Sequence, residues 1–359
     1  MKTLILNLFL LLAGLCSAQD ATFDMSYANR LLLNPAFCGG NGEGVVRTSL
    51  FHHNVFNAMN GTYNNSSASI DYLFCEPKIA VGLIAQNENQ GAGLLTINSI
   101  SPVIGIPIEI NPNLLLSFGL QADFMNQSVD WSKMVFSDQI SPTLGVVQSS
   151  SNANATLLNR SAYGVSSGIN LTGKNRIPIF VKKHIYEGNN MYKWNIGIAL
   201  NHIYSSPVGL LDNTAIIPMR LTVHGGLVLE RYDKMLDGTY EFSVRYDRQP
   251  ALSLQGVNSA LLVNANYYFN SYFSLGMGAR PNLTNDSWKS INTFIISTGI
   301  IPPKSDFLKV NLSYGVSMGQ IGFANTFEIG LILFSPKHCI SNNPCPDMNG
   351  KERKMNLIF

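Results

Sequence analysis

Apolar and polar residues alternate with a period of two along much of this chain. In residues 240–247, the apolar set Tyr240, Phe242, Val244 and Tyr246 is interleaved with Glu241, Ser243, Arg245 and Asp247. Successive side chains of a β-strand point to opposite faces, so this pattern predicts a strand with one apolar and one polar face. A helix would instead place its apolar residues three and four positions apart.

The same alternation recurs at residues 67–74, 113–120, 194–201 and 308–315. Together, such runs predict about fourteen strands, an even number, as single-chain bacterial membrane barrels require. We expect the strands to start near Val45, Ser67, Ile79, Leu94, Asn113, Ala162, Lys193, Ile216, Tyr240, Ala260, Tyr272, Ser290, Phe307 and Asn325. A soluble β-sandwich or propeller is the alternative, because half-buried strands show the same pattern.

Composition favours a protein whose outer surface contacts lipid. The chain is 46% hydrophobic and 13% charged, which is about half the charged share of an average soluble protein. The apolar faces of the expected strands carry no charge, and a charge at mid-depth on a lipid face costs roughly 2–4 kcal/mol. Beyond the N-terminal segment, no apolar run approaches the roughly 18 residues of a membrane helix. We therefore predict an all-β fold, a transmembrane antiparallel β-barrel.

The N-terminal sequence MKTLILNLFLLLAGLCSAQ has the features of an export signal. Lys2 is followed by an apolar stretch and then by the small residues Ser17 and Ala18. This order predicts a signal peptide at residues 1–18, cleaved before Gln19. Lipid attachment at Cys16 is the weaker alternative, because Leu15 stands where a small residue is needed. An exported barrel implies the outer membrane of a Gram-negative bacterium.

We find no linker or composition shift that divides the remaining chain, so we expect one barrel at residues 45–335. A barrel of about fourteen strands is too wide for its wall side chains to fill. Its lumen must hold water, a folded-in segment or a bound partner. Residues 19–44 are predicted to be an N-terminal periplasmic or plug segment, and the proline-containing residues 336–359 a periplasmic tail.

The longest predicted connection spans residues 126–160. If the chain enters the barrel from the periplasm, the turns at 75–78, 270–271 and 302–305 are periplasmic and this connection faces outward. It is mostly polar but carries the apolar residues Trp131, Met134, Phe136 and Ile140. Exposed apolar loop residues indicate either a partner contact or a lid that packs back over the barrel mouth.

The cysteines after the signal peptide are Cys38, Cys75, Cys339 and Cys345. An even number in an exported protein permits disulfides, in three possible pairings. We favour Cys38 with Cys75 and Cys339 with Cys345, because the predicted topology places all four at the periplasmic end; unpaired cysteines are the alternative. No C-x-x-C spacing occurs and only His338 adjoins a cysteine, so we predict no metal site.

No constellation of residues indicates catalysis. The six histidines are dispersed and the G-x-S-x-G motif of many hydrolases is absent. A barrel phospholipase using serine and histidine would escape this test, but we predict no enzyme and no cofactor. The net charge is +2 with scattered Lys and Arg, so nucleic acid is not an implied partner. We expect Asp71, Gln121, Asp123, Arg245, Asp247, Lys309 and Glu328 to line the lumen or to pair there.

Several short segments carry a resemblance to a known family. The first is Gln19-Asp20 with Phe23 and Ser26, followed by Leu33-Asn34-Pro35-Ala36-Phe37-Cys38-Gly39; later come Ser69-Ile70-Asp71, Phe118-Gly119-Leu120-Gln121-Ala122, His224-Gly225-Gly226, Tyr314-Gly315-Val316-Ser317 and Phe327-Glu328-Ile329. In this order they resemble the PorP/SprF family of outer-membrane proteins of the Bacteroidetes type IX secretion system. The chain departs from the family at Cys38, usually a small residue, at Phe327, often histidine, and in its cysteine-bearing tail.

The resemblance implies a barrel in contact with outer-membrane lipid that works with other secretion-system subunits. It further implies a partner, a secreted adhesin or other type IX cargo held at the cell surface by its C-terminal domain, in some bacteria for gliding motility. The alternative function is a FadL-like outer-membrane channel for uptake of hydrophobic small molecules. Such channels also have about fourteen strands and an N-terminal segment with Asn-Pro-Ala, here Asn34, Pro35 and Ala36.

Overall fold

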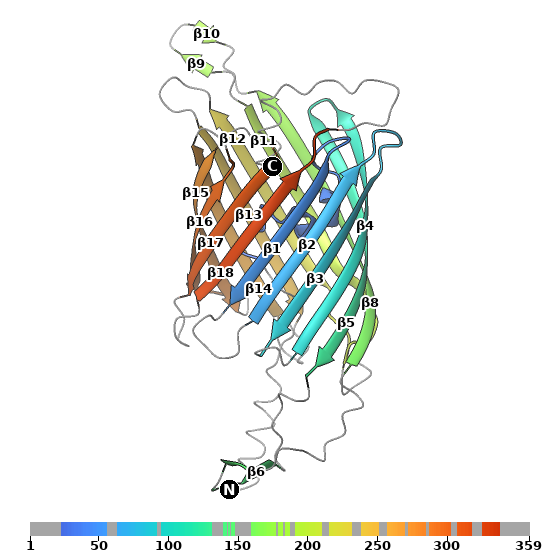
Figure 1. Cartoon of the computed structure of the whole chain (residues 1–359). Helices are drawn as coiled ribbons and strands as arrows, with labels where there is room; N and C mark the ends of the chain where they lie inside the picture. The colour runs from blue at the N-terminus through green and yellow to red at the C-terminus, as the bar shows by residue number, and fades with distance from the viewer. Residues whose placement is uncertain are drawn as a thin grey trace.

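Fourteen antiparallel strands form one closed barrel in the computed structural model (Figure 1). The structure describes residues 23–55, 63–91, 95–130, 139–141, 143, 145–147, 159–176, 179–181, 184–186, 191–209, 215–231, 238–250, 257–269, 272–284, 287–302, 307–317 and 325–337. Closure comes from the first and last strands, which pair from Arg47 opposite Phe334 to Val55 opposite Thr326. The predicted fold class is confirmed.

The barrel strands follow one another around the wall in chain order. They are β1 Val46–Val55, β2 Tyr63–Leu73, β3 Ala80–Gln90, β4 Leu95–Asn111, β5 Leu114–Val129, β8 Asn159–Arg176, β11 Met191–Ser205, β12 Arg220–Arg231, β13 Gly238–Pro250, β14 Val257–Phe269, β15 Phe273–Thr284, β16 Ser287–Ile300, β17 Leu308–Ser317 and β18 Asn325–Phe334. All fourteen were predicted. The largest differences in starting position are four residues, at β2 (Tyr63 against Ser67) and β12 (Arg220 against Ile216).

The remaining described elements are short. A four-residue helix, α2 Arg30–Leu33, and a 3-10 turn, η1 Pro35–Phe37, precede the barrel. Two small hairpins, β6 Ile140–Ser141 with β7 Gly145–Val146 and β9 Ile179–Val181 with β10 His184–Tyr186, lie in connections. No helix among the described residues is long and apolar enough to span a bilayer.

Alternation along each strand separates the outer face from the lumen. On β13, Phe242 and Val244 are each 44% exposed, whereas Glu241 and Arg245 are buried. Strand β4 shows the same division, because Ile100, Ile104, Ile106, Ile108 and Ile110 are all about half exposed or more while Ser101 and Val103 are buried. The exposed apolar side chains thus form the surface that faces lipid.

The two ends of the barrel carry different connections. One end of the barrel, uppermost in Figure 1, is called the turn end here. It holds the start of β1, the end of β18 and the β2–β3 and β4–β5 turns. The connection from Val129 to Asn159 lies at the opposite end, which we call the loop end. This division between the ends agrees with the predicted topology.

Residues 23–44, which we call the lumen segment, lie inside the barrel. Every residue from 23 to 39 is buried except Leu32, which is half-buried. Phe23, Met25 and Tyr27 pack with Phe51 of β1 and Ile332 of β18. Farther along the segment, Leu31 and Cys38 form a second cluster with residues on the inner faces of β2, β3 and β4. The wall members are Leu73, Ala80, Ile84 and Val103. The apolar core is therefore formed between the lumen segment and one side of the wall.

Replacing Ile104 with lysine should test which face meets lipid. Ile104 lies midway along the apolar run of β4 and is 52% exposed. We expect Ile104→Lys to reduce the free energy of unfolding in liposomes by about 2–4 kcal/mol, because a cation at mid-depth must leave water. Ile110→Lys, at the end of the same run, should cost at most about 1 kcal/mol. Equal losses for the two variants in denaturant titrations would contradict this assignment.

Candidate functional site

The first attachment of the lumen segment to the wall is made by Asp24. Its carboxylate forms an ion pair with Arg280 of β15, lies 3.5 Å from His53 Nε2 and accepts a hydrogen bond from Thr326 Oγ1 at 2.8 Å. Glu328 of β18 accepts hydrogen bonds from the backbone N–H groups of Asp24, at 2.6 Å, and Met25. Four side chains from three strands thus hold one end of the segment.

Ligand atoms of Asp24, His53 and Glu328 lie within 4.8 Å of one another. Such a set of one imidazole and two carboxylates is chemically able to bind a divalent cation. Here the Asp24 carboxylate pairs with the Arg280 guanidinium, and Glu328 is occupied by backbone N–H groups. A bound cation would compete with these contacts, so we interpret the cluster as an anchor of the segment.

The second attachment is made by Asn34, the first residue of the Asn-Pro-Ala motif. Its side-chain Oδ1 accepts a hydrogen bond from Ala36 N at 2.9 Å, which caps η1. Its Nδ2 donates to the backbone carbonyls of Ile169, at 3.1 Å, and Ile198, at 3.3 Å. Those two residues are directly paired across β8 and β11, so one amide joins the segment to two strands.

Glycines in the wall make room for this motif. A side chain at Gly168 of β8 would overlap the Asn34 amide, and one at Gly119 of β5 would overlap the backbone between Pro35 and Ala36. On the other side, the Phe37 ring lies 5.1 Å from the His224 ring of β12. The predicted motif residues Asn34, Pro35, Ala36 and Phe37 are therefore all buried contacts between the segment and the wall.

Past η1, the segment is attached to β2 and to the turn end. Gly39 donates its backbone N–H to the Asp71 carboxylate at 2.9 Å. Gly39 has a φ of 72°, a conformation that favours glycine. Farther on, Glu43 pairs with Lys78 Nζ at 3.0 Å, and Glu109 pairs with the same amine at 3.1 Å. Hydrogen bonds to these two carboxylates raise the pKa of the Lys78 amine.

The preferred pairing of Cys38 with Cys75 is wrong. Cys38 is a free, buried cysteine, whereas Cys75 is disulfide-bonded. The Cys38 side chain faces the inner wall, close to the glycines Gly82 and Gly105. Sequence topology placed both cysteines at one end of the barrel but could not show that one of them enters the lumen. Cys339 and Cys345 lie outside the described residues.

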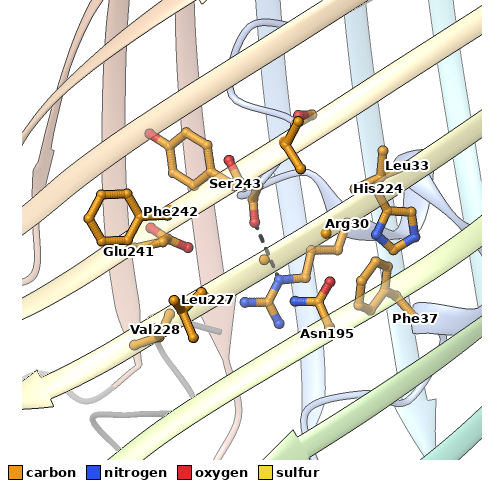
Figure 2. A pocket seen from close by; sticks show the side chains of 15 residues that line it. Arg30, Leu33, Phe37, Asn195, His224, Leu227, Val228, Glu241, Phe242 and Ser243 are labelled. Carbon is orange, nitrogen blue, oxygen red and sulfur yellow. Dashed lines mark hydrogen bonds between the residues drawn. The ribbon is translucent and has the colours of Figure 1, made fainter.

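A cavity remains between the lumen segment and strands β11 to β13. It has a volume of about 30 Å³ and is lined by side chains that include Arg30, Asn195 and Glu241. Figure 2 shows Arg30 reaching into it, with Phe37 and His224 on one side and Glu241 on the other. The Arg30 guanidinium is charged there, because arginine is not deprotonated in proteins.

The predicted lumen residues all lie on the inner face of the wall. Asp247 pairs with Arg245 Nε at 2.7 Å. Lys309 donates to the Tyr268 hydroxyl at 2.9 Å, and that hydroxyl donates to Glu241 at 2.6 Å. Asp123 accepts hydrogen bonds from Gln121, Ser101 and Ser166. Charges at these positions are thus satisfied within the lumen.

The structure describes one of the four predicted partner-contact residues. Trp131, Met134 and Phe136 lie outside the described residues. Ile140 is 49% exposed in β6, which pairs with β7.

Substituting Gly168 should loosen the Asn34 attachment. A methyl group at this position overlaps the Asn34 amide, so we expect Gly168→Ala to break its hydrogen bonds to Ile169 and Ile198. Amide hydrogen exchange in residues 29–37 should then become roughly 10–100-fold faster, as a loss of one to three hydrogen bonds implies. Gly225→Ala is the matched control, because a methyl group there meets only ordinary contacts at 3.6 Å. Unchanged exchange in the Gly168 variant would argue against the attachment.

Several solved structures have a similar arrangement. The toluene transporter TbuX of Ralstonia pickettii is 12% identical with a TM-score of 0.47, over 89% of this chain and 96% of that one. The toluene transporter TodX of Pseudomonas putida is 8% identical (TM-score 0.42; 89% and 98% covered), and a FadL homologue of Pseudomonas aeruginosa is 9% identical (0.40; 89% and 98%).

No curated protein matches the sequence. A family profile does, however. Residues 15–333 match the profile described as type IX secretion system membrane protein PorP/SprF. The matched range includes the lumen segment and every barrel strand, except the last residue of β18. The match agrees with the closed barrel and with the order of the short motifs. The chain therefore belongs to the PorP/SprF family and is an outer-membrane β-barrel component of the type IX secretion system.

Proposed function

We propose that this barrel holds a secreted adhesin, or other type IX cargo, at the cell surface by the cargo's C-terminal domain. The observation that carries the proposal is that residues 23–44 of the chain occupy its own lumen. A barrel occupied in this way is suited to retaining a partner at its rim. In a gliding bacterium, the same attachment would serve motility.

The attachments of the lumen segment support retention over conduction. Three residues of the segment are bound to different parts of the wall. Asp24 contacts β15 and β18, Asn34 contacts β8 and β11, and Gly39 contacts β2. Opening a path would require several buried hydrogen bonds and an ion pair to break together, each at a cost of roughly 1–3 kcal/mol. A constitutively open channel is therefore disfavoured.

The loop end is where we place the partner. Periplasmic turns of outer-membrane barrels are short and outer loops are longer, so the connection between β5 and β8 is assigned to the cell exterior. The exposed Ile140 lies in this connection, as do Trp131, Met134 and Phe136 in the sequence. Apolar side chains on an exposed loop provide the anchors that protein partners use.

The alternative, uptake of hydrophobic small molecules, receives less support from the lumen. Its wall carries the buried charges of Asp71, Arg245, Lys309 and Glu328, which offer an apolar solute no favourable surface. Liposome swelling or solute uptake by the purified barrel would favour this alternative.

Deleting the apolar part of the outer connection should test retention of cargo. We would replace residues 131–158 with a short Gly/Ser linker and crosslink intact cells before purifying the barrel. Recovery of proteins carrying a type IX C-terminal domain, measured by mass spectrometry, should fall at least about tenfold, which corresponds to about 1.4 kcal/mol of lost binding. The barrel itself should still assemble, because these residues lie outside its strands.

A matched control comes from another connection at the loop end. Replacing residues 251–256, between β13 and β14, should leave cargo recovery unchanged. The proposal fails if the intact barrel recovers no such cargo, or if both replacements reduce recovery equally.

A further inference from the structure

A band of neutral polar side chains interrupts the apolar outer face near the loop end. Strand register aligns the band in two rows across six neighbouring strands. The first row is His52, Ser66, Asn87, Asn98, Asn126 and Ser161, and the second is Asn54, Asn64, Asn89, Thr96, Ser128 and Asn159. We call these residues the amide band. None of them is Asp, Glu, Lys or Arg.

The band lies on the outer face, because its neighbours in the chain point inward. His53 and Asn65 are buried in the lumen, whereas His52, Asn98 and Asn159 are exposed. Hydrogen bonds cross from strand to strand along the band: His52 Nδ1 with Ser66 Oγ at 2.9 Å, Asn87 Nδ2 to Asn98 Oδ1 at 2.7 Å, Thr96 Oγ1 to Asn89 Oδ1 at 2.9 Å, and Asn126 Nδ2 to Asn159 Oδ1 at 2.9 Å.

The outer face changes from apolar to polar between one outward-facing residue and the next along each strand. The next outward row toward the turn end is Leu50, Ala68, Ala85, Ile100, Phe124 and Tyr163. Ile100, Phe124 and Tyr163 are each more than half exposed. Large apolar side chains on β4, β5 and β8 therefore directly adjoin the amides.

The rows run obliquely across the barrel wall. Hydrogen-bonded partners lie perpendicular to their strands, and barrel strands tilt by about 40° from the axis. Five steps of about 4.8 Å from β1 to β8 thus shift a row by roughly 15 Å along the axis. Figure 1 shows this slope, because the loop-end tips of β1 and β2 lie nearer the turn end than those of β5 and β8.

A lipid boundary is level and cannot follow this slope. Tyr163 is the next outward-facing residue after Ser161 on β8. The two residues are separated by about 5 Å along the barrel axis, with Tyr163 nearer the turn end. A boundary drawn at Tyr163 therefore leaves His52 on β1 roughly 10 Å inside the hydrocarbon, by the same geometry. Each polar side chain of the band on β1, β2 and β3 is hydrogen-bonded to a neighbour within the band. An amide has donors and acceptors beyond one such bond, and lipid chains at that depth cannot pair with them.

We propose that the part of the amide band on β1, β2 and β3 is the interface for a second copy of this chain. An amide carries both a donor and an acceptor, so the band is complementary to itself across a two-fold axis normal to the membrane. The band carries no Asp, Glu, Lys or Arg that would repel its copy. Ser66, Ala68 and Ala85 are small, which allows two walls to approach closely.

Cysteine crosslinking in native outer membranes tests this interface. A cysteine near the two-fold axis should form a disulfide with its copy, so Ser66→Cys is expected to give a covalent dimer under mild oxidation. Ile104→Cys is the matched control, since it lies on the apolar face of β4. The unsubstituted chain, in which Cys38 is buried and Cys75 is already bonded, is the blank. We expect roughly tenfold more dimer from Ser66→Cys than from either control, in line with a specific interface.

A second variant distinguishes a specific interface from chance collisions. The variant adds Asn64→Leu and Asn87→Leu to the Ser66→Cys chain. These changes remove two amides at outward-facing positions, where an apolar side chain is tolerated. The amount of dimer should then fall to the control level, while the barrel still migrates as a folded species. Three results would overturn the proposal: no dimer above the controls, crosslinking to a different protein, or an unchanged dimer after amide removal. Copurified glycolipid that protects Ser66→Cys from thiol reagents would also overturn it, because a lipid headgroup would then cover the band.

Discussion

Hydrocarbon offers the backbone no hydrogen-bond partner, and this constraint shapes the whole molecule. It requires every strand to pair on both sides, which the β1–β18 contact achieves. Closure in turn sends every second residue into the lumen, where polar side chains leave bulk water. Those groups then need partners of their own. The lumen segment supplies them: Glu328 and Asp71 accept backbone N–H groups from it, and Arg47 donates to the Ala28 carbonyl.

The same contacts meet the needs of the lumen segment. Its helix α2 has only four residues, and η1 has three, so regular helical hydrogen bonds pair only part of its backbone. Wall carboxylates accept its N–H groups, and the Asn34 amide bonds both to η1 and to two strands. Because each side satisfies groups that the other leaves open, the segment and wall form one cooperative unit.

Alternation predicted the strands well because lipid acts on every second residue along the whole wall. The same signal could not show which distant residues meet. Asp24 and Glu328 are joined by a hydrogen bond across 304 positions, and no local pattern marks that contact. Gly119 and Gly168 are wall residues whose role becomes apparent only when the motif around Asn34 lies against them. The error at Cys38 has the same origin, since topology gives height along the barrel but not distance from its axis.

Outward orientation does not by itself define lipid contact, as β1 and β4 illustrate. Both strands alternate, yet at the membrane depth where β1 presents His52 and Asn54, β4 presents isoleucines. The difference follows from strand tilt, which carries a row of equivalent positions through several depths of the membrane. Amides near the β1 end therefore lie as deep as Tyr163 on β8 or deeper. A wall with such a polar region at hydrocarbon depth is suited to a protein neighbour on that side, and the apolar faces elsewhere are suited to lipid.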